Sequence, residues 1–208
     1  MRLVLSRRRL FATAWCGVPL AGCSVLPAPP AAQLYRLSPS IDDPPNDRVL
    51  HKRLVVDIPV ASESLDTDRI ALTRNRTRFD YYAESLWTDR VPLLLQGLLV
   101  EALENDGTVA EVGRNARTLT PDFVLETEIR DFQASYAVPD EPPAVIVTLA
   151  LGLVKMPDRR MVGQMALTES LSASHNSLDS VVEAFDIAVG KILGRSVAWA
   201  TRTMLQSR

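Results

Sequence analysis

The sequence predicts an α+β fold, a two-layer sandwich in which a mainly antiparallel sheet carries two amphipathic helices on one face. In residues 91–103 and 178–199, apolar side chains recur every three or four positions, which is the spacing of an amphipathic helix. Residues 123–130 instead alternate between apolar and polar side chains, as a strand with one wet face does. Two such helices need one apolar sheet face on which to bury their stripes, so the pattern predicts two layers.

The size and composition of the chain suit one domain of this kind. It has 208 residues, of which 47% are hydrophobic and 23% are charged, as in an ordinary globular protein. We expect a signal peptide over 1–22, a proline-rich tether over 23–32 and a single domain over 33–208. The formal charge of −2 gives no basic excess, which argues against nucleic acid as a partner.

The N-terminal half of the domain is predicted to consist of short strands. Alternating side chains, bounded by turn residues, indicate strands over 33–37, 54–58, 70–73, 78–83 and, more weakly, 108–112. The third and fourth of these strands form a hairpin with residues 74–77 at its tip.

The first helix is predicted to begin at Val91, with Thr88 or Asp89 as its N-cap, and to end before Gly107. Pro92 falls in the first turn of this helix. Because an N–H there has no intrahelical acceptor, the missing N–H of proline costs the helix nothing.

The C-terminal strands are predicted to form an antiparallel meander. The strand at 123–130 is followed by a nearly continuous apolar run at 144–154, a turn at 157–159 and alternating residues at 161–171. The apolar run has hydrophobic side chains on both faces, and only one face can contact the helices. The other face needs cover, which an oligomer interface or a lipid-facing lumen would supply; the tether or a loop is the alternative. We favour an oligomer, since an uncovered aliphatic patch is unusual on a monomer.

The closing helix is expected to begin near Leu178. Ser180 and Glu183 have the spacing of a capping box, in which each side chain satisfies a backbone N–H of the first turn. The apolar stripe continues to Trp199, so a long amphipathic helix closes the chain.

The first 22 residues have the features of an export signal. Four arginines within the first nine residues precede an apolar stretch, 10–20, that is too short to span a bilayer. Residues 20–23, Leu-Ala-Gly-Cys, resemble the lipobox of bacterial lipoproteins, in which the thiol of Cys23 would carry a thioether-linked diacylglycerol. The alternative is a chance thiol after an ordinary signal peptide. Residues 6–11 also resemble a twin-arginine signal, so the route of export stays open between that and Sec.

Lipid modification of Cys23 predicts lasting attachment to a membrane. A single acyl chain binds only marginally, but a diacylglycerol with a further N-acyl chain such as palmitate holds a protein firmly. Residues 24–32 are rich in proline and alanine, and we expect them to form an extended spacer. Ser24 rather than Asp follows Cys23, which in the enterobacterial sorting scheme directs a lipoprotein to the outer membrane.

Cysteine and histidine give no sign of a metal centre. Cys16 and Cys23 both lie in the first 23 residues, so the domain has no cysteine for a disulfide, a thiolate metal site or a nucleophile. His51 and His175 lie in polar sequence far apart, and no third ligand has a suitable spacing. We therefore predict no metal site and no cofactor apart from the covalent lipid.

One pair of carboxylates is the best candidate for acid–base catalysis. Glu126 and Glu128 share a strand face, where mutual desolvation could raise one pKa. Arg130 continues the same row, and a charge-balanced wet face explains all three residues equally well. The sequence also lacks the G-x-S-x-G elbow of serine hydrolases and the phosphate-binding loop of ATPases. We predict no enzymatic activity.

Several strings of residues occur together here in a known combination. The Leu-Ala-Gly-Cys segment at 20–23 and the tether come first, followed by Leu-Tyr-Arg-Leu at 34–37. The string Leu-Asp-Thr-Asp-Arg-Ile at 65–70 then precedes an arginine-rich hairpin, and residues 81–87 lead into the leucine-rich helix. This combination resembles the ABC-type transport auxiliary lipoproteins (PqiC-like) over almost all of 20–208. The resemblance implies a non-enzymatic lipoprotein that works beside an MCE-domain protein and an inner-membrane ABC transporter in lipid traffic, and relatives are known to form rings.

We accordingly predict a lipoprotein at the periplasmic face of the outer membrane that binds and positions partners of a lipid transport system. One alternative is a structural assembly factor for an outer-membrane protein. A second is a periplasmic hydrolase, which lacks its catalytic parts in this sequence.

The residues most suited to partner contact surround the predicted hairpin. Guanidinium groups there could bind lipid phosphates or an acidic partner, whereas a solvated hairpin with nearby aspartates is the alternative. The neighbouring aromatic side chains are of types enriched at interfaces, although strand alternation places at least one of them in the core. The candidates are Arg69, Arg74, Arg76, Arg78, Tyr81, Tyr82 and Trp87.

Overall fold

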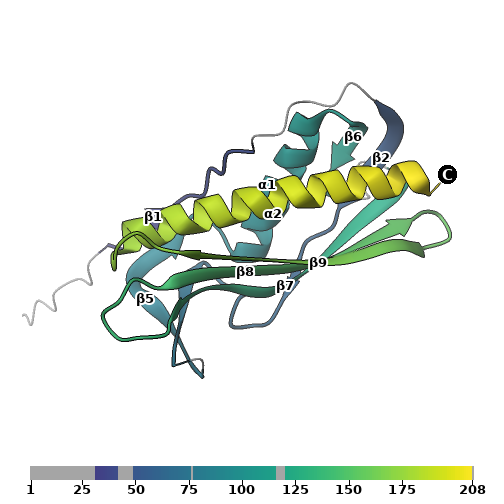
Figure 1. Ribbon diagram of the computed structural model, residues 1–208. Helices are drawn as coiled ribbons and strands as arrows, with labels where there is room; N and C mark the ends of the chain where they lie inside the picture. The colour runs from purple at the N-terminus through teal and green to yellow at the C-terminus, as the bar shows by residue number, and fades with distance from the viewer. Residues whose placement is uncertain (1–30, 42–48, 76, 116–119, 208) are drawn as a thin grey trace, which may run out of the picture. The chain divides into compact units, whose positions relative to one another are not determined.

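The computed structural model describes residues 31–41, 49–75, 77–115 and 120–207 (Figure 1). The predicted signal peptide, Cys23 and most of the tether lie outside these ranges. Every core residue in the described ranges lies between Leu37 and Met204, and residues 31–208 form one compact unit with a complete hydrophobic core.

The elements are β1 (Gln33–Tyr35), β2 (Leu50–Val56), β3 (Val60–Ala61), β4 (Arg69–Arg74), β5 (Arg78–Trp87), α1 (Val91–Asp106), β6 (Val109–Gly113), β7 (Phe123–Tyr136), β8 (Ala144–Lys155), β9 (Arg160–Ser172) and α2 (Leu178–Gln206).

The long strand β7 organises the sheet. On one side it pairs along its whole length with β8, which pairs with β9, and both pairings are antiparallel, as the predicted meander requires. On its other side β7 pairs in succession with β2, β3 and β4, each of them parallel. The outermost strands β6 and β1 are also joined in parallel, to β2 and to β5. The sheet is therefore mixed but mostly antiparallel, because the antiparallel pairings are the long ones.

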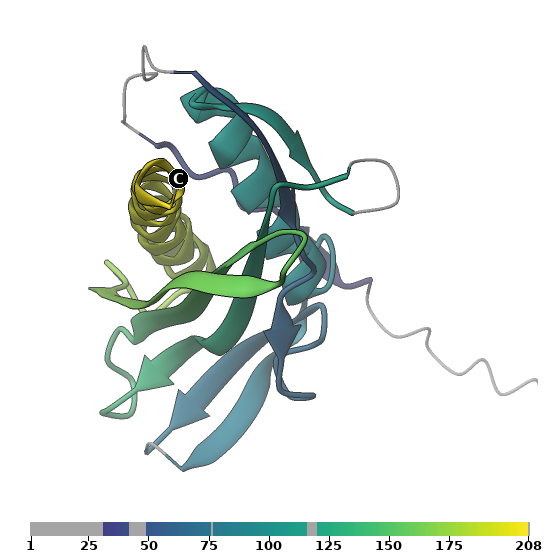
Figure 2. The same ribbon diagram turned by 90° about the vertical axis from the view of Figure 1, so that its right-hand side faces the viewer.

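The predicted two-layer architecture is confirmed. Figures 1 and 2 show α1 and α2 on the same side of a curved sheet, with α2 running alongside β8 and β9. On β8, five residues point toward the helices and are buried: Val145, Val147, Leu149, Leu151 and Leu153. A β-bulge between Ile129 and Asp131 resets the alternation of β7, so Phe132 is buried as well and the strand continues six residues beyond its predicted end.

Both helices begin at the predicted residues, but the caps differ from the prediction. Helix α1 follows Arg90, not Thr88 or Asp89, and no side chain caps it. The backbone N–H of Val91 instead donates to the carbonyl of Thr67 at 3.0 Å. This tertiary hydrogen bond satisfies one of the free N–H groups at the helix N-terminus. At the other end Gly107 adopts φ 70°, the left-handed conformation that ends many helices, as expected from the sequence.

Helix α2 is capped one turn earlier than the predicted capping box. Ser177 is the N-cap, and its hydroxyl accepts from the backbone N–H of Ser180. Ser180 and Glu183 consequently lie inside the helix, and their capping-box spacing has no structural meaning here. Asp179 in the first turn adds favourable charge next to the helix N-terminus.

The face of the sheet that points away from the helices is not the aliphatic patch expected from residues 144–154. The outward residues of β8 are mostly small, and only Ile146 and Val154 are large and aliphatic. Val154 is 4% exposed, and the side chain of Met161 lies over Gly152, where an added Cβ would be 3.1 Å from Cε. Because the side chains on this face are mostly small, it exposes less apolar surface than the sequence predicted.

Candidate functional site

The β4–β5 hairpin divides the predicted partner-binding residues between two faces. Its register places Arg74 directly opposite Arg78, so these two side chains share one face. Arg69 lies against Tyr81 on the other face. Arg76 lies outside the described residues. Arginines that are crowded in the sequence thus form two separate groups.

The outer group is a cation–π contact supported by a second ring. The guanidinium carbon of Arg69 is 3.8 Å from the centroid of the Tyr81 ring, and Phe79 meets Tyr81 edge to face at 5.5 Å. The hydroxyl of Tyr81 donates to the carbonyl of Ser64 at 3.0 Å. This group therefore fixes the hairpin to the loop that precedes β4.

The inner group is a hydrogen-bonded chain. Tyr136 donates its hydroxyl proton to Asn176 Oδ1 at 3.1 Å, so Tyr82 is the donor in the 3.0 Å bond between the two tyrosine hydroxyls. Burial raises the pKa of Tyr82 well above its ordinary value of 10, and the hydrogen bond to Tyr136 adds to the shift. Arg74 lies over the Tyr136 ring at 5.6 Å. Tyr136 and Asn176 were not predicted, because they come from β7 and from the loop before α2.

Arg74 and Arg78 are two like charges that face each other at the hairpin end. Neither forms a salt bridge with a carboxylate of the described residues. Like charges directly opposite each other on two strands destabilise a hairpin. An anion bound between the two guanidinium groups would remove this repulsion, which makes the hairpin end a candidate contact site.

Trp87 is not available as a contact residue. It is 1% exposed and packs edge to face against Phe132 and Phe185, at 5.9 and 5.2 Å between ring centroids. This end of β5 lies under α2, which carries Phe185, whereas the hairpin end extends beyond the helix. Strand alternation placed at least one of the three aromatic residues in the core, and that residue is Trp87.

The tether joins the domain at the end of β5 farthest from the hairpin. Strand β1 pairs with residues 85–87, and the chain then runs along α2. We call residues 33–41 the strap. Tyr35 donates its hydroxyl to Asp179 at 3.2 Å, and the backbone N–H of Ser38 donates to Asp186 at 2.6 Å. Further along, Ser40 lies so close to Gly190 that a Cβ there would be 2.8 Å from its carbonyl oxygen. The strap is therefore fastened to successive turns of α2.

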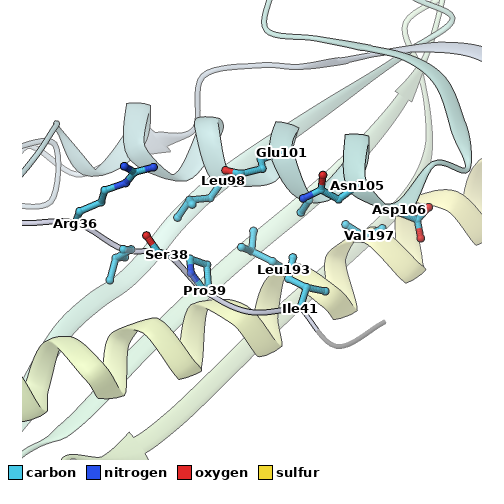
Figure 3. A pocket seen from close by; sticks show the side chains of 12 residues that line it. Arg36, Ser38, Pro39, Ile41, Leu98, Glu101, Asn105, Asp106, Leu193 and Val197 are labelled. Carbon is cyan, nitrogen blue, oxygen red and sulfur yellow. The ribbon is translucent and has the colours of Figure 1, made fainter. Parts of the chain in front are cut away.

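A cavity of about 210 Å³ lies where the strap passes between the two helices (Figure 3). Buried apolar side chains from all three segments line it, among them Leu37, Ala102 and Leu193. Arg36 and Glu101, which are exposed, also line it. Sequence reasoning did not find this cavity, because its walls come from three segments whose apolar residues are typical of any core.

The remaining candidates have structural partners. Glu126 is 3.5 Å from Arg159, and Glu128 is 3.0 Å from Arg130, so charge balance accounts for the carboxylate pair. Among the described residues, no group of three or more His, Cys, Asp and Glu could hold a metal ion. None of the helices in these ranges is long and apolar enough to cross a bilayer.

The chain thus forms a small α+β domain with an exposed hairpin end and a lined cavity. Solved structures share this architecture: protein XCC0632 from Xanthomonas campestris is 25% identical, with a TM-score of 0.77 over 84% of this chain and 98% of that chain. A second, uncharacterized protein is 15% identical, with a TM-score of 0.60 over 84% of this chain and 99% of that one, which shows the shared fold alone. No curated protein matches the sequence significantly.

The family model of the ABC-type transport auxiliary lipoprotein component matches residues 35–195, and the chain belongs to this family. The resemblance found in the sequence is thus confirmed. The protein is an auxiliary lipoprotein component of ABC-type transport, anchored to a membrane in the cell envelope, and its partners include transporter components. The family is not a known family of enzymes.

Proposed function

We propose that this chain is the periplasmic auxiliary lipoprotein of an MCE-type lipid transport system, held at the outer membrane, where it binds and positions the other components. The observation that carries the docking role is the unpaired couple Arg74 and Arg78 at the free end of the hairpin. Arg78 lies seven positions along β5 from Ser85, the first residue paired with β1, which is at most about 23 Å of strand. A partner at the hairpin end would therefore not cover the strand pair through which the tether enters the domain.

Cys23 is the proposed anchor, with a diacylglycerol on its sulfur and an acyl chain on its amino group. The ten residues 23–32 reach at most about 33 Å when extended, so the domain would stay near the bilayer. Mass spectrometry of the mature N-terminus tests this step. We expect a triacylated peptide beginning at Cys23 and release of the Cys23→Ala variant from the membrane fraction; an unmodified N-terminus would overturn the anchor. Density separation of the two membranes tests the assignment to the outer one.

The docking role is tested by crosslinking in cells. A photoreactive residue at position 77, which is exposed beside Arg78, should capture an MCE-domain protein, whereas the same residue at position 202, exposed on α2, should not. Adding Arg74→Gln to the probe at position 77 should lower its crosslink yield several-fold. Capture of an outer-membrane barrel protein alone would favour the assembly-factor alternative and overturn the transport proposal. No protein crosslink at position 77 would overturn docking through the hairpin.

We also propose that the domain assembles into a ring of identical copies. The support is the free edge of β9: in the described residues this strand of 13 residues pairs only with β8, so its outer row of backbone groups is open to another strand. Light scattering of residues 31–208 at micromolar concentration should give one defined multiple of the monomer mass. A monomer over the whole concentration range would contradict the ring.

A further inference from the structure

We propose that the cavity between α1, α2 and the strap binds the end of a single alkyl chain, from an amphiphile with a zwitterionic head. The chain would lie among the buried apolar residues, the anionic part of the head would lie against Arg36, and its cationic part against Glu101. The inference does not rest on the hairpin or on an MCE partner, because the cavity shares no residue with the hairpin end.

The interior of the cavity suits a hydrocarbon chain. Leu193 and Val197 of α2 are almost fully buried, as is Ala102 of α1. Figure 3 shows Leu98 and Leu193 pointing from the two helices toward the space between them, with Ile41 of the strap beside Leu193. Seven of the twelve residues that line the cavity are apolar and five are polar or charged, so the lining offers an amphiphile both an apolar and a polar part.

The cavity is built into the fold. On its α2 side the strap is fastened by the bond from Ser38 to Asp186 and by the close approach of Ser40 to Gly190. Toward α1, no hydrogen bond of the described residues joins the strap to the helix. The strap is therefore held against α2, and the cavity meets solvent at its exposed lining residues Arg36, Glu101 and Asn105. A ligand would not have to create this space, which lowers the entropic cost of binding.

The volume sets the length of chain that fits. An apolar cavity of about 150 Å³ binds benzene, which has six carbons. At the same volume per carbon, the 210 Å³ of this cavity accommodates about eight carbons in a row. A longer chain would extend past the opening with the remainder of its carbons in solvent.

The charges at the opening select the head. In the described residues Arg36 forms no salt bridge with a carboxylate, and Glu101 forms none with a cationic side chain. Asn105 lies one turn beyond Glu101 on the same face of α1, and Asp106, which accepts the backbone N–H of Thr108 at 3.2 Å, lies at the other end of the cavity from Arg36 (Figure 3). A purely anionic head beside Arg36 would also lie near Glu101, and a purely cationic head beside Glu101 would lie near Arg36. A zwitterion matches both signs.

A series of alkylphosphocholines with four to twelve carbons tests the proposal. Each is titrated into residues 31–208 below its micelle-forming concentration, and binding is followed by calorimetry and by amide NMR shifts. We expect saturable one-to-one binding that strengthens about fourfold per carbon, the equivalent of roughly 0.8 kcal/mol, and levels off near eight carbons. Shifts should centre on the strap and α1. Absence of saturation, or strengthening that continues unchanged to twelve carbons, would overturn the proposal.

Two variants separate the chain site from the head site. Ala102→Leu fills the cavity and should weaken octylphosphocholine binding by at least thirtyfold, whereas Ala198→Leu, on the exposed face of α2, should not change it. Arg36→Gln should weaken the binding of octylphosphocholine about fivefold. The same variant should bind octyl glucoside, which has no charge, with an affinity within twofold of wild type. Arg202→Gln is the control for this change of charge.

The folding of each variant is checked by circular dichroism. If Ala102→Leu does not fold, Leu98→Phe, at a half-buried position, blocks the same space. Undiminished binding to a folded cavity-filling variant would place the ligand elsewhere and overturn the inference. An equal loss for both octyl compounds in Arg36→Gln would overturn the assignment of the head to Arg36.

Discussion

The two ends of β5 carry aromatic residues of similar kind in very different surroundings. At one end Trp87 is enclosed by Phe132 and Phe185, and β1 pairs alongside. At the other end Tyr81 and Tyr82 remain half-buried: Tyr81 has a hydrogen bond to Ser64 and Arg69 over its ring, and Tyr82 has a hydrogen bond to Tyr136. Helix α2 covers only the first end, so the same strand supplies core at one end and surface at the other.

This difference shows what a binding hairpin needs. Its exposed end cannot rely on hydrophobic burial for its conformation, so polar contacts take over: the Tyr82–Tyr136–Asn176 chain on one face and the Arg69–Tyr81 contact on the other. The covered end anchors the strand in the core. The substitutions below test this division between the two ends.

Trp87→Ala should have the largest effect. Removing a fully buried indole leaves a cavity between β5 and α2, and we expect a loss of about 3–5 kcal/mol in the free energy of unfolding, measured with urea. Phe79→Ala at the hairpin end, where the ring is 40% exposed, should cost less than about 1 kcal/mol. Equal losses at the two positions would contradict the division.

Gly190→Ala should come next, because it tests the strap that joins the covered end to the tether. The added Cβ would approach the carbonyl oxygen of Ser40 to 2.8 Å, and backbone must move to relieve the clash. We expect a loss of about 1–3 kcal/mol in thermal and urea unfolding. Gly97→Ala in α1 is the matched control: its Cβ would have only an ordinary contact at 3.7 Å, so helix propensity should stabilise the protein by up to about 1 kcal/mol. A stabilised Gly190→Ala variant would show that the strap is not closely packed.

Tyr82→Phe should have a smaller, pH-dependent effect at the hairpin end. Loss of the bond to Tyr136 should cost about 1 kcal/mol at neutral pH. Because the pKa of Tyr82 is raised in the folded protein, its contribution is complete below pH 10, the ordinary value in the unfolded chain, and is lost as the pH rises above it. The stability difference between wild type and variant should therefore shrink above pH 10 in urea titrations. A difference that stays constant to pH 11 would contradict the burial of this hydroxyl.

Arg74→Gln should have the smallest effect on stability, and of opposite sign. Removing one of two facing charges should stabilise the domain by a few tenths of a kcal/mol, and the gain should decrease in high salt. Arg202→Gln on α2 should leave the free energy of unfolding unchanged. A clear loss on replacing Arg74 would mean that this residue is needed for the fold itself and not kept for a ligand.

The sequence was informative where a signal is local. The hairpin, the meander over 123–172 and the two helices were all predicted, because periodicity and turn residues record them within a few positions. The parallel pairing of β4 with β7 was not predicted. Its partners are about 60 residues apart, and the spacing of residue types within a strand does not indicate which other strand it pairs with. The cap of α1 was also missed, because a carbonyl 24 residues earlier supplies it.

The candidate site was predicted in part for the same reason. Residue type identified the hairpin, but the sequence could not decide which aromatic side chain is buried. Alternation along the strand assigns Tyr82 and Trp87 each to a face of the sheet. Which residues of a face are buried depends on where α2 lies, and the sequence does not show this. The register likewise set Arg74 and Arg78 apart from Arg69, although all of them are close together in the sequence.

The central position of β7 governs the order in which the domain can be completed. Strands β2, β3 and β4 leave the ribosome before β7, and all three need β7 as their parallel partner. About three fifths of the polypeptide is therefore made before β7 can join its partners, and contacts of such long sequence separation slow folding. Until then the strands of the first part can pair only as β4 with β5, β1 with β5 and β2 with β6, which leaves the edges that β7 later covers open to a chaperone that holds the nascent chain.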